Sequence, residues 1–274
     1  MVDVPIESTE RQSAERAPVR FRGGGFEPVS RQWAAWLFFV LVLLGWEMAS
    51  RHRLIDPLFL PPPSQIWTAL QDMVLSGELF RHLAASLVRI GFGWLIGSAA
   101  GVLLGGLIGL SSLGRSIGLP FISALFPVPK IALLPLLILW LGIGEASKVA
   151  TIALGVFFPM AVSTYAGVDA VPRNLIRMAQ SFNLPFRSII SNVVVPAMLP
   201  SVLSGCRISA SIALILVVSA EMIGANTGIG ALLLTTGNLM QTDQLMAALV
   251  AIAVLGLLIG ALISWLERVL LAWR

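Results

Sequence analysis

The sequence has unusually little charge for its length. Of its 274 residues, 18 are Lys or Arg and 14 are Asp or Glu, together 12% of the chain, whereas an ordinary soluble domain carries about 25%. A chain this poor in charge cannot cover a globular surface with hydrated groups, which excludes a soluble enzyme. Its abundance of apolar residues also excludes a disordered protein and a collagen-like fibre.

Cysteine is almost absent, and so is nucleotide-binding chemistry. Cys206 is the only cysteine and lies in an apolar run, so a disulfide framework and a cysteine-based metal site are excluded. His52 and His82 have no partners at ligand spacing, so we expect no metal site. No Gly-x-x-x-x-Gly-Lys-Ser/Thr motif occurs, which excludes a P-loop site for ATP and Mg²⁺ in this chain.

Apolar residues dominate the sequence. They make up 57% of the chain, and the mean hydropathy is +0.90. The pI of about 10.2 reflects a net charge of only +4. We attribute this small excess to the arrangement of charges around a membrane and not to a nucleic-acid partner. The composition indicates an integral membrane protein.

Six segments are long and apolar enough to cross a membrane, which takes about 20 residues as a helix. We expect an all-α protein whose transmembrane domain covers 33–274, preceded by a flexible cytoplasmic tail over 1–32 that is too polar to be a signal peptide. Gly97, Gly101 and Gly105 share one helical face, which favours close packing by a neighbouring helix over a transport path. The predicted spans are about 33–50, 84–110, 120–142, 147–168, 198–224 and 244–271.

The distribution of arginine predicts the orientation. With the N-terminus in the cytoplasm, eleven arginines fall in cytoplasmic segments, and three arginines and Lys148 fall in outer ones. The positive-inside rule therefore places both termini in the cytoplasm. The outer segment of about 51–83 contains three consecutive prolines. Ser64 follows them, and we expect it to cap a short interfacial helix that continues to about Val74.

The cytoplasmic segment of about 169–197 has the pattern of two short helices with a bend between them. Pro172 suits the first turn of the first helix, and Pro185 suits the start of the second. Asn183 lies where the first helix must end, in a position that favours a left-handed C-terminal cap. Pro196 marks the return to the membrane. Such a segment is either a docking device or an ordinary amphipathic loop.

This segment resembles the ATPase-docking motif of the inner-membrane permeases of binding-protein-dependent ABC importers. That motif reads Glu-Ala-Ala, three residues, Gly, nine residues, Ile-x-Leu-Pro. Its spacing falls on Arg177-Met178-Ala179, on Asn183 and on 193–196, although only Ala179 and Pro196 match in identity. Arg177 stands where the motif has Glu, and Asn183 stands where it has Gly.

Further stretches are similar to the nitrate, taurine and aliphatic-sulfonate branch of these permeases, and the resemblance covers about 35–272. It implies a type I permease fold in a bacterial inner membrane. It also implies a homodimer, an ATPase partner that binds ATP and Mg²⁺ and docks on the 177–196 loop, and a periplasmic or lipid-anchored binding protein. The stretches that carry it are 57–63, 82–89, 127–129, 134–135, 142–148 and 220–223.

We therefore expect the permease subunit of an importer for a small anion, with sulfonates or taurine first and nitrate second. Aromatic acids or a pyrimidine precursor of thiamine are further cargoes of related permeases. The alternative is a self-sufficient secondary transporter or channel for a small anion. The absence of an inverted repeat and of an intramembrane Asp/Glu/His relay from the sequence argues against it.

Charged side chains inside the spans are candidates for the translocation path, because each costs about 2.5–3.5 kcal/mol at the centre of a span. Arg207 either faces an anion path or is structural, snorkelling to headgroups or bonded to helix-end carbonyls. Lys130 follows a proline break and could influence the choice of substrate. Glu221 and Arg89 either pair in an outer gate or occupy unrelated interfacial positions. Glu145 and Lys148 are expected to form a solvated pair.

Overall fold

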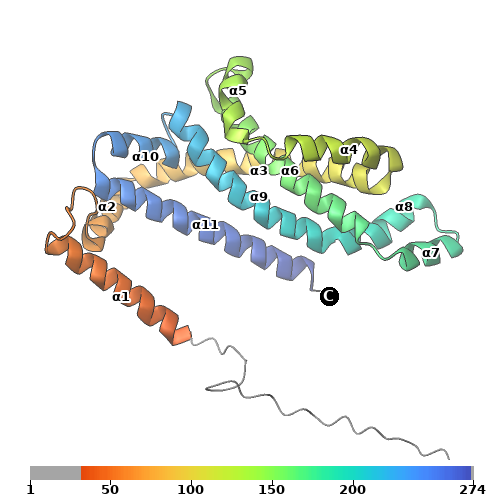
Figure 1. Cartoon of the computed structure of the whole chain (residues 1–274), viewed down its shortest axis with the longest axis horizontal. Coiled ribbons are helices and arrows are strands. Elements are labelled where there is room, and N and C mark those ends of the chain that lie inside the picture. The colour runs from red at the N-terminus through yellow and green to blue at the C-terminus, as the bar shows by residue number, and fades with distance from the viewer. Residues whose placement is uncertain (1–31, 273–274) are drawn as a thin grey trace, which may run out of the picture. The chain divides into compact units, whose positions relative to one another are not determined.

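The computed structural model describes residues 32–272, so the predicted tail lies outside the described residues apart from Gln32. The chain divides into two compact units, 1–46 and 47–274. The helix α1 (Gln32–Arg51) begins in the first unit and ends in the second. Within 32–272 every regular element is a helix (Figure 1).

The second unit begins with the end of α1 and the short helix α2 (Pro63–Leu75). The sequence predicts Ser64 as the N-cap of α2, and this prediction is wrong, because Ser64 is the second residue of the helix. The Glu47 carboxylate takes that role. It accepts hydrogen bonds from the Ser64 amide at 3.0 Å and from the Ser64 hydroxyl at 2.8 Å. A carboxylate is favourable at this position because the N-terminus of a helix is electropositive.

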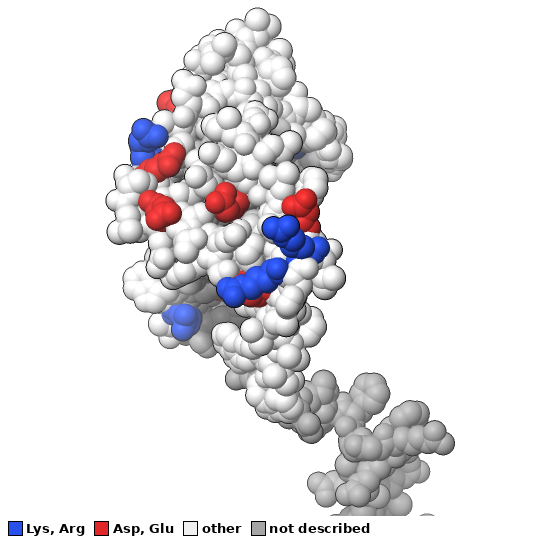
Figure 2. Space-filling view, turned by 90° about the vertical axis from the view of Figure 1, so that its left-hand side faces the viewer, with Lys and Arg blue, Asp and Glu red and all other residues white. Residues whose placement is uncertain are grey.

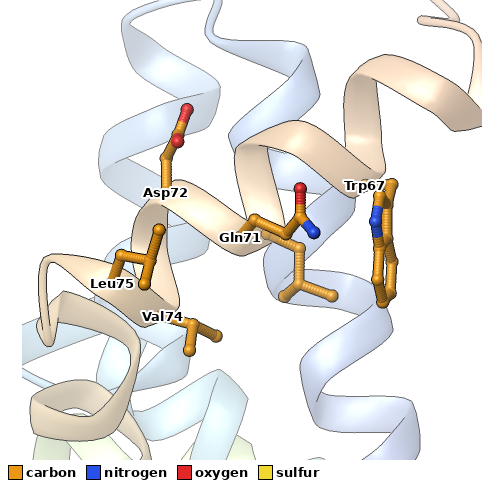
Figure 3. Close-up of a pocket in the computed structure, with 6 residues that line it drawn as sticks. Trp67, Gln71, Asp72, Val74 and Leu75 are labelled. Atoms are coloured by element: carbon orange, nitrogen blue, oxygen red, sulfur yellow. The ribbon is translucent and has the colours of Figure 1, made fainter.

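A groove of about 400 Å³ lies along α2 (Figure 3). All of its lining residues belong to α2. The side chains of Trp67 and Leu75 project from this helix well apart from one another (Figure 3). A groove built by one helix is a shallow feature of the surface, without polar groups converging from several elements. The groove on α2 therefore lacks the features of a functional site.

Three long helices form the centre of the second unit: α3 (Glu78–Leu110), α6 (Glu145–Asp169) and α9 (Val195–Gly224). Buried apolar side chains from all three, including Ile90, Val156 and Val217, form one core cluster. The C-terminal helix α11 (Thr242–Leu270) and the short α10 (Ile229–Asn238) complete the bundle beside α9 (Figure 1).

The glycine face of α3 packs against α6. A Cβ atom added to Gly97 would lie 2.4 Å from the Ala153 carbonyl oxygen, and one added to Gly105 would lie 2.4 Å from that of Ala161. These distances are shorter than any van der Waals contact, so the two backbones approach as closely as glycine allows. The predicted close approach of a neighbouring helix is confirmed.

The predicted third span is broken. Helix α4 (Ser112–Leu125) ends before Pro127 and Pro129, and the chain continues through the short 3₁₀ helix η1 (Lys130–Leu133) into α5 (Leu134–Leu141). The direction changes by 88° at this break. Five helices of the described residues are long and apolar enough to cross a membrane, and the predicted number of six is reached when the bent pair counts as one span.

The 169–197 loop contains the predicted pair of helices, with one difference. Helix α7 (Arg173–Ser181) follows Pro172, and α8 (Phe186–Ile189) follows Pro185. The sequence predicts the return to the membrane at Pro196 and a fifth span from about 198. Instead, α8 continues through a π-helical turn over Ile190–Val194 directly into α9.

Candidate functional site

The bend of the 169–197 loop is formed by Asn183 in the left-handed conformation, with φ of 54°. The Leu184 amide donates to the Ala179 carbonyl at 3.2 Å, and the Asn183 amide donates to the Gln180 carbonyl at 2.9 Å. These bonds satisfy carbonyls that a helix end leaves free. The predicted left-handed cap is confirmed, and it fixes the angle at which α8 leaves α7.

The surface of this loop is apolar at its tip and basic around it. Phe182 is 73% exposed and Phe186 is 65% exposed, and Met178 is also largely exposed. Arg177 and Arg187 are exposed on the same two helices. Ala179 is different, since it is only 3% exposed and belongs to the inner side of α7. Large exposed aromatic side chains on a short loop are typical of a docking surface.

Pro196 accounts for the π-helical turn that joins the loop to α9. A proline inside a helix has no N–H to donate, and its ring collides with the carbonyl four residues earlier. Pro196 is one of the first residues of α9, and the residue four positions before it, Asn192, lies in the widened turn. The wider turn accommodates the ring and keeps α8 continuous with α9.

Of the two alternatives for Arg89 and Glu221, a pair or unrelated positions, the structure shows the pair. It belongs to a larger set of buried polar groups that we call the Arg89 network. Arg89 Nη1 donates to Glu221 Oε1 at 2.7 Å, and the Glu221 side chain has no exposed surface. The Glu221 carboxylate also accepts from the Ser86 hydroxyl at 2.8 Å and from the Gly230 amide at 2.9 Å. This carboxylate is therefore fully hydrogen-bonded, as a buried charge must be.

The other edge of the Arg89 guanidinium holds Glu145. Nε and Nη2 donate to the two carboxylate oxygens of Glu145 at 2.6 and 2.7 Å. Lys148 Nζ lies 3.6 Å from Glu145 Oε1, and the Lys148 side chain is only 7% exposed. The predicted Glu145–Lys148 pair is present, and Glu145 is 63% exposed, but the prediction that the pair is solvated is wrong for Lys148, which is buried. The i, i+3 spacing indicates that the two side chains are near each other, but it carries no information about a buried arginine on another helix.

Two further members of the network, His82 and Ser86, were not predicted as site residues, since the sequence analysis considered His82 only as a metal ligand. Ser86 Oγ accepts from the Ile229 amide at 2.9 Å, and His82 Nδ1 lies 2.8 Å from the Gly228 carbonyl oxygen. Together they attach the start of α10 to α3. A signal was present in the sequence, because His82, Ser86 and Arg89 lie four and three residues apart and so share one face of an otherwise apolar helix.

Gly228 is required by this geometry. Its φ of 125° is a conformation that side-chain-bearing residues rarely adopt, and a Cβ atom there would lie 2.3 Å from the Glu221 carboxyl carbon.

Lys130 closes the end of α4. Its ammonium donates to the carbonyls of Leu125, Phe126 and Val128 at 2.8, 2.9 and 2.6 Å. These carbonyls lie at the proline break, where that of Leu125 also accepts from the Val128 amide at 3.2 Å, and an ammonium has three N–H donors in all. Lys130 also borders a cavity of about 240 Å³ between the break, α6 and α9.

Arg207 on α9 is paired with α11. Its guanidinium donates to the Glu267 carboxylate and, at 3.3 Å, to the Ser264 hydroxyl. This ion pair differs from the helix-end carbonyls that we expected as structural partners. The side chain is half exposed and borders an open cavity of about 660 Å³. Arg207 and Lys130 thus lie at separate places and do not join the Arg89 network.

The sequence of the second unit matches a known family over residues 97–273: the binding-protein-dependent transport system inner membrane component. The chain belongs to this family. It is 33% identical to the putative aliphatic sulfonates transport permease protein SsuC of Bacillus subtilis over 270 residues, which are 98% of this chain and 95% of that protein. It is 36% identical to the taurine transport system permease protein TauC of Escherichia coli over 253 residues, 90% of this chain and 92% of that protein.

The fold agrees with this assignment. A solved structure of the MetNI methionine ABC transporter in inward-facing conformations superposes with a TM-score of 0.57 over 73% of this chain and 97% of that chain, at 21% sequence identity. The chain therefore has the fold of a type I ABC importer permease, and the resemblance expected from the sequence is confirmed.

Proposed function

We propose that this permease forms the translocation path of an ATP-driven importer for aliphatic sulfonates or taurine. The observation that carries the proposal is the family membership together with identities of 33% and 36% to permeases named for these cargoes. Nitrate remains the second candidate cargo, on the resemblance described above. We further propose a homodimer in a bacterial inner membrane with both termini in the cytoplasm.

In this proposal the 169–197 loop docks a separate ATPase subunit, which binds ATP and Mg²⁺ and hydrolyses the nucleotide. The exposed Phe182 and Phe186 support this role, because they place apolar area on an otherwise basic loop. Ala179 and Asn183 contribute by shaping the loop, and Pro196 by joining it to α9. Arg177 and Met178 lie on the exposed side of α7, where a partner can reach them. A substrate-binding protein delivers the anion from outside.

The charged groups of the spans have two roles in this proposal. Arg89 and Glu221 close the outer end of the bundle as a gate, since their pair joins α3 and α9 and holds the start of α10. Lys130 and Arg207 are candidates for the path, because each borders open space next to α9.

Uptake of radiolabelled taurine and of an alkanesulfonate into membrane vesicles tests the proposal. We expect uptake that requires ATP, a binding protein and a co-purifying ATPase. Phe182→Asp should abolish both the uptake and the recovery of the ATPase, because it places a charge in the apolar tip of the loop.

The matched control is Leu75→Asp, which changes an equally apolar and exposed residue on α2 and should leave ATPase recovery unchanged. ATP-independent uptake by the purified chain in liposomes would contradict the proposal and favour a self-sufficient secondary transporter or channel.

A further inference from the structure

Three positive features converge on the carboxylate of Glu145. Arg89 donates to both of its oxygens, at 2.6 and 2.7 Å, and Lys148 Nζ lies 3.6 Å from one of them. Glu145 is also the first residue of α6, where the helix dipole is positive and the N-cap residue, Gly144, provides no side-chain acceptor. This carboxylate therefore lies in a clamp made of two cations and a helix N-terminus, which we call the Glu145 clamp.

Burial within the clamp is strongly unequal. The side chains of Arg89 and Lys148 are 3% and 7% exposed, whereas that of Glu145 is 63% exposed. In a static buried ion pair both partners are enclosed, as Arg89 and Glu221 are. Here the cations are fixed inside the bundle, and the anion that balances them is on a side chain at the surface. The carboxylate can move into solvent while the cations remain buried.

The guanidinium of Arg89 is held independently of Glu145. Its Nη1 donates to Glu221 at 2.7 Å and to the Thr227 carbonyl at 2.5 Å, and both of these partners belong to other segments. Departure of Glu145 therefore leaves the Nε/Nη2 edge in place, with the Thr227 hydroxyl at 3.5 Å from Nη2 as its remaining partner. A fixed pair of parallel N–H donors is the arrangement that binds oxyanions in a bidentate manner.

Lys148 indicates which oxyanion fits. Both oxygens of the Glu145 carboxylate accept from Arg89, and Lys148 Nζ, at 3.6 Å from Oε1, lies beyond the distance of a direct hydrogen bond. A sulfonate has three oxygens in a tetrahedral arrangement. Two of them match the Arg89 edge, and the third is available to accept a hydrogen bond from the buried Lys148 ammonium.

We propose that Arg89, Lys148 and the N-terminus of α6 form a binding site for a sulfonate or a similar oxyanion, and that Glu145 occupies this site when the ligand is absent. The choice of sulfonate rests on the proposed function. Helix α3 begins and α9 ends on the side of the bundle that carries α10 (Figure 1), which is the expected outer side. An anion released by a binding protein reaches this end first. By displacing Glu145, it becomes the negative charge that balances Arg89 and Lys148.

Figure 2 shows the same end of the molecule from outside, with acidic and basic side chains scattered over a mostly uncharged surface. Acidic side chains lie beside the basic ones on this face. The concentrated positive charge is inside, at the two cations that Glu145 covers. Selective binding at this end thus depends on the clamp and not on the surrounding surface.

The test measures thermal unfolding of the full-length permease, purified with the subunits that accompany it, during titration with sodium methanesulfonate. In Glu145→Ala the clamp is vacant, so we expect the unfolding midpoint to rise by about 5 °C at a ligand concentration about 100 times the dissociation constant. Wild type should need at least about tenfold more ligand for the same rise, because its own carboxylate competes. Sodium chloride at equal ionic strength should produce no rise in either protein.

Two further variants separate the clamp from a general effect of charge. Glu145→Ala combined with Lys148→Met should lose the response to methanesulfonate, and Asp72→Ala, which removes an exposed carboxylate on α2, should behave as wild type does. If Glu145→Ala does not fold, Glu145→Gln keeps the side-chain volume and should show the same rise. A Glu145 variant that folds and responds no more strongly than wild type overturns the proposal.

The source of the anion and the proposed cargo are tested separately. A rise of the midpoint with phosphatidylglycerol micelles but not with methanesulfonate would assign the clamp to a lipid headgroup and overturn the proposal. Taurine uptake by wild-type vesicles without ligand binding by the Glu145 variants would overturn the proposed binding site and leave the proposed function intact. Methanesulfonate binding by those variants without sulfonate uptake by the wild type would support the proposed binding site and contradict the proposed cargo.

Discussion

At the scale of single residues, most of what the structure adds to the sequence is the identity of the partners of the buried charges. Arg89 and Glu221 are 132 positions apart. The sequence offered their pairing as one of two alternatives, because each interrupts an apolar span near its expected outer end. The burial of Lys148 was not predictable, since it depends on where α3 and α9 lie relative to the start of α6. The residue pattern of one helix does not reveal which side chain of another helix pairs with it.

Glu221→Ala should destabilise the protein by about 3–5 kcal/mol, because it leaves the buried Arg89 guanidinium without one of its two charged partners. It also removes the acceptor of the Ser86 hydroxyl and the Gly230 amide. Chemical or thermal unfolding in a mild detergent measures the effect. Asp72→Ala is the control, since this carboxylate is exposed, and it should change stability by less than about 0.5 kcal/mol. Equal effects of the two variants would contradict the structural role of Glu221.

At the scale of elements, the expected spans were found wherever an apolar run is uninterrupted, and the differences arise at prolines. The break at Pro127 and Pro129 was expected, but its angle of 88° depends on how α5 packs against α6. Pro196 was expected to begin a span and instead lies just after a π-helical turn within a continuous helix. Proline excludes a regular helix locally, but it does not choose between a break and a wider turn.

The glycine face of α3 offers a comparison between two adjacent positions. Gly105→Ala should destabilise the protein by about 1–3 kcal/mol, because its Cβ would lie 2.4 Å from the Ala161 carbonyl oxygen. A Cβ atom added to Gly106 would have no neighbouring atom within 4 Å. Gly106→Ala should therefore stabilise the helix by up to about 1 kcal/mol. Unfolding measurements on both variants test this prediction. If the two substitutions changed the stability in the same direction, the close α3–α6 packing would be contradicted.

The bend of the 169–197 loop makes a second prediction at this scale. Asn183→Gly should preserve the loop, since glycine adopts the φ of 54° without strain. Asn183→Val should cost about 1–3 kcal/mol in the same conformation, because a β-branched residue is disfavoured there. The amount of ATPase that co-purifies with each variant reports the difference, and equal recovery with Val would show that docking does not depend on this bend.

At the scale of the whole molecule, the fold class was predictable because composition alone requires a membrane protein and the 169–197 loop has a distinctive spacing. The order of the spans followed from the apolar runs. The packing of α3 against α6 and of α6 against α9 did not follow from the apolar runs, apart from the glycine face. The sequence of an apolar helix in lipid gives little indication of which helix packs against it. The Arg89 network joins four segments and so becomes visible only once that packing is known.

The proposed orientation predicts opposite accessibility at two exposed positions. In a Cys206→Ala background, Leu54→Cys should react with a membrane-impermeant thiol reagent in intact cells, because it follows α1 on the expected outer side. Ser112→Cys, at the start of α4, should react only after the membrane is permeabilised. Labelling in the reverse order would place the termini outside.

One continuous helical stretch, Phe186–Gly224, contains both an exposed tip of the 169–197 loop and the carboxylate of Glu221. Its 39 residues correspond to a length of about 58 Å at 1.5 Å per residue. A rod of that length acts as a lever: tilting it by about 5° about one end displaces the other by about 5 Å, more than the length of any hydrogen bond in the Arg89 network. A partner that tilts the loop by a few degrees therefore applies, at the far end of the same rod, a movement large enough to separate Glu221 from Arg89.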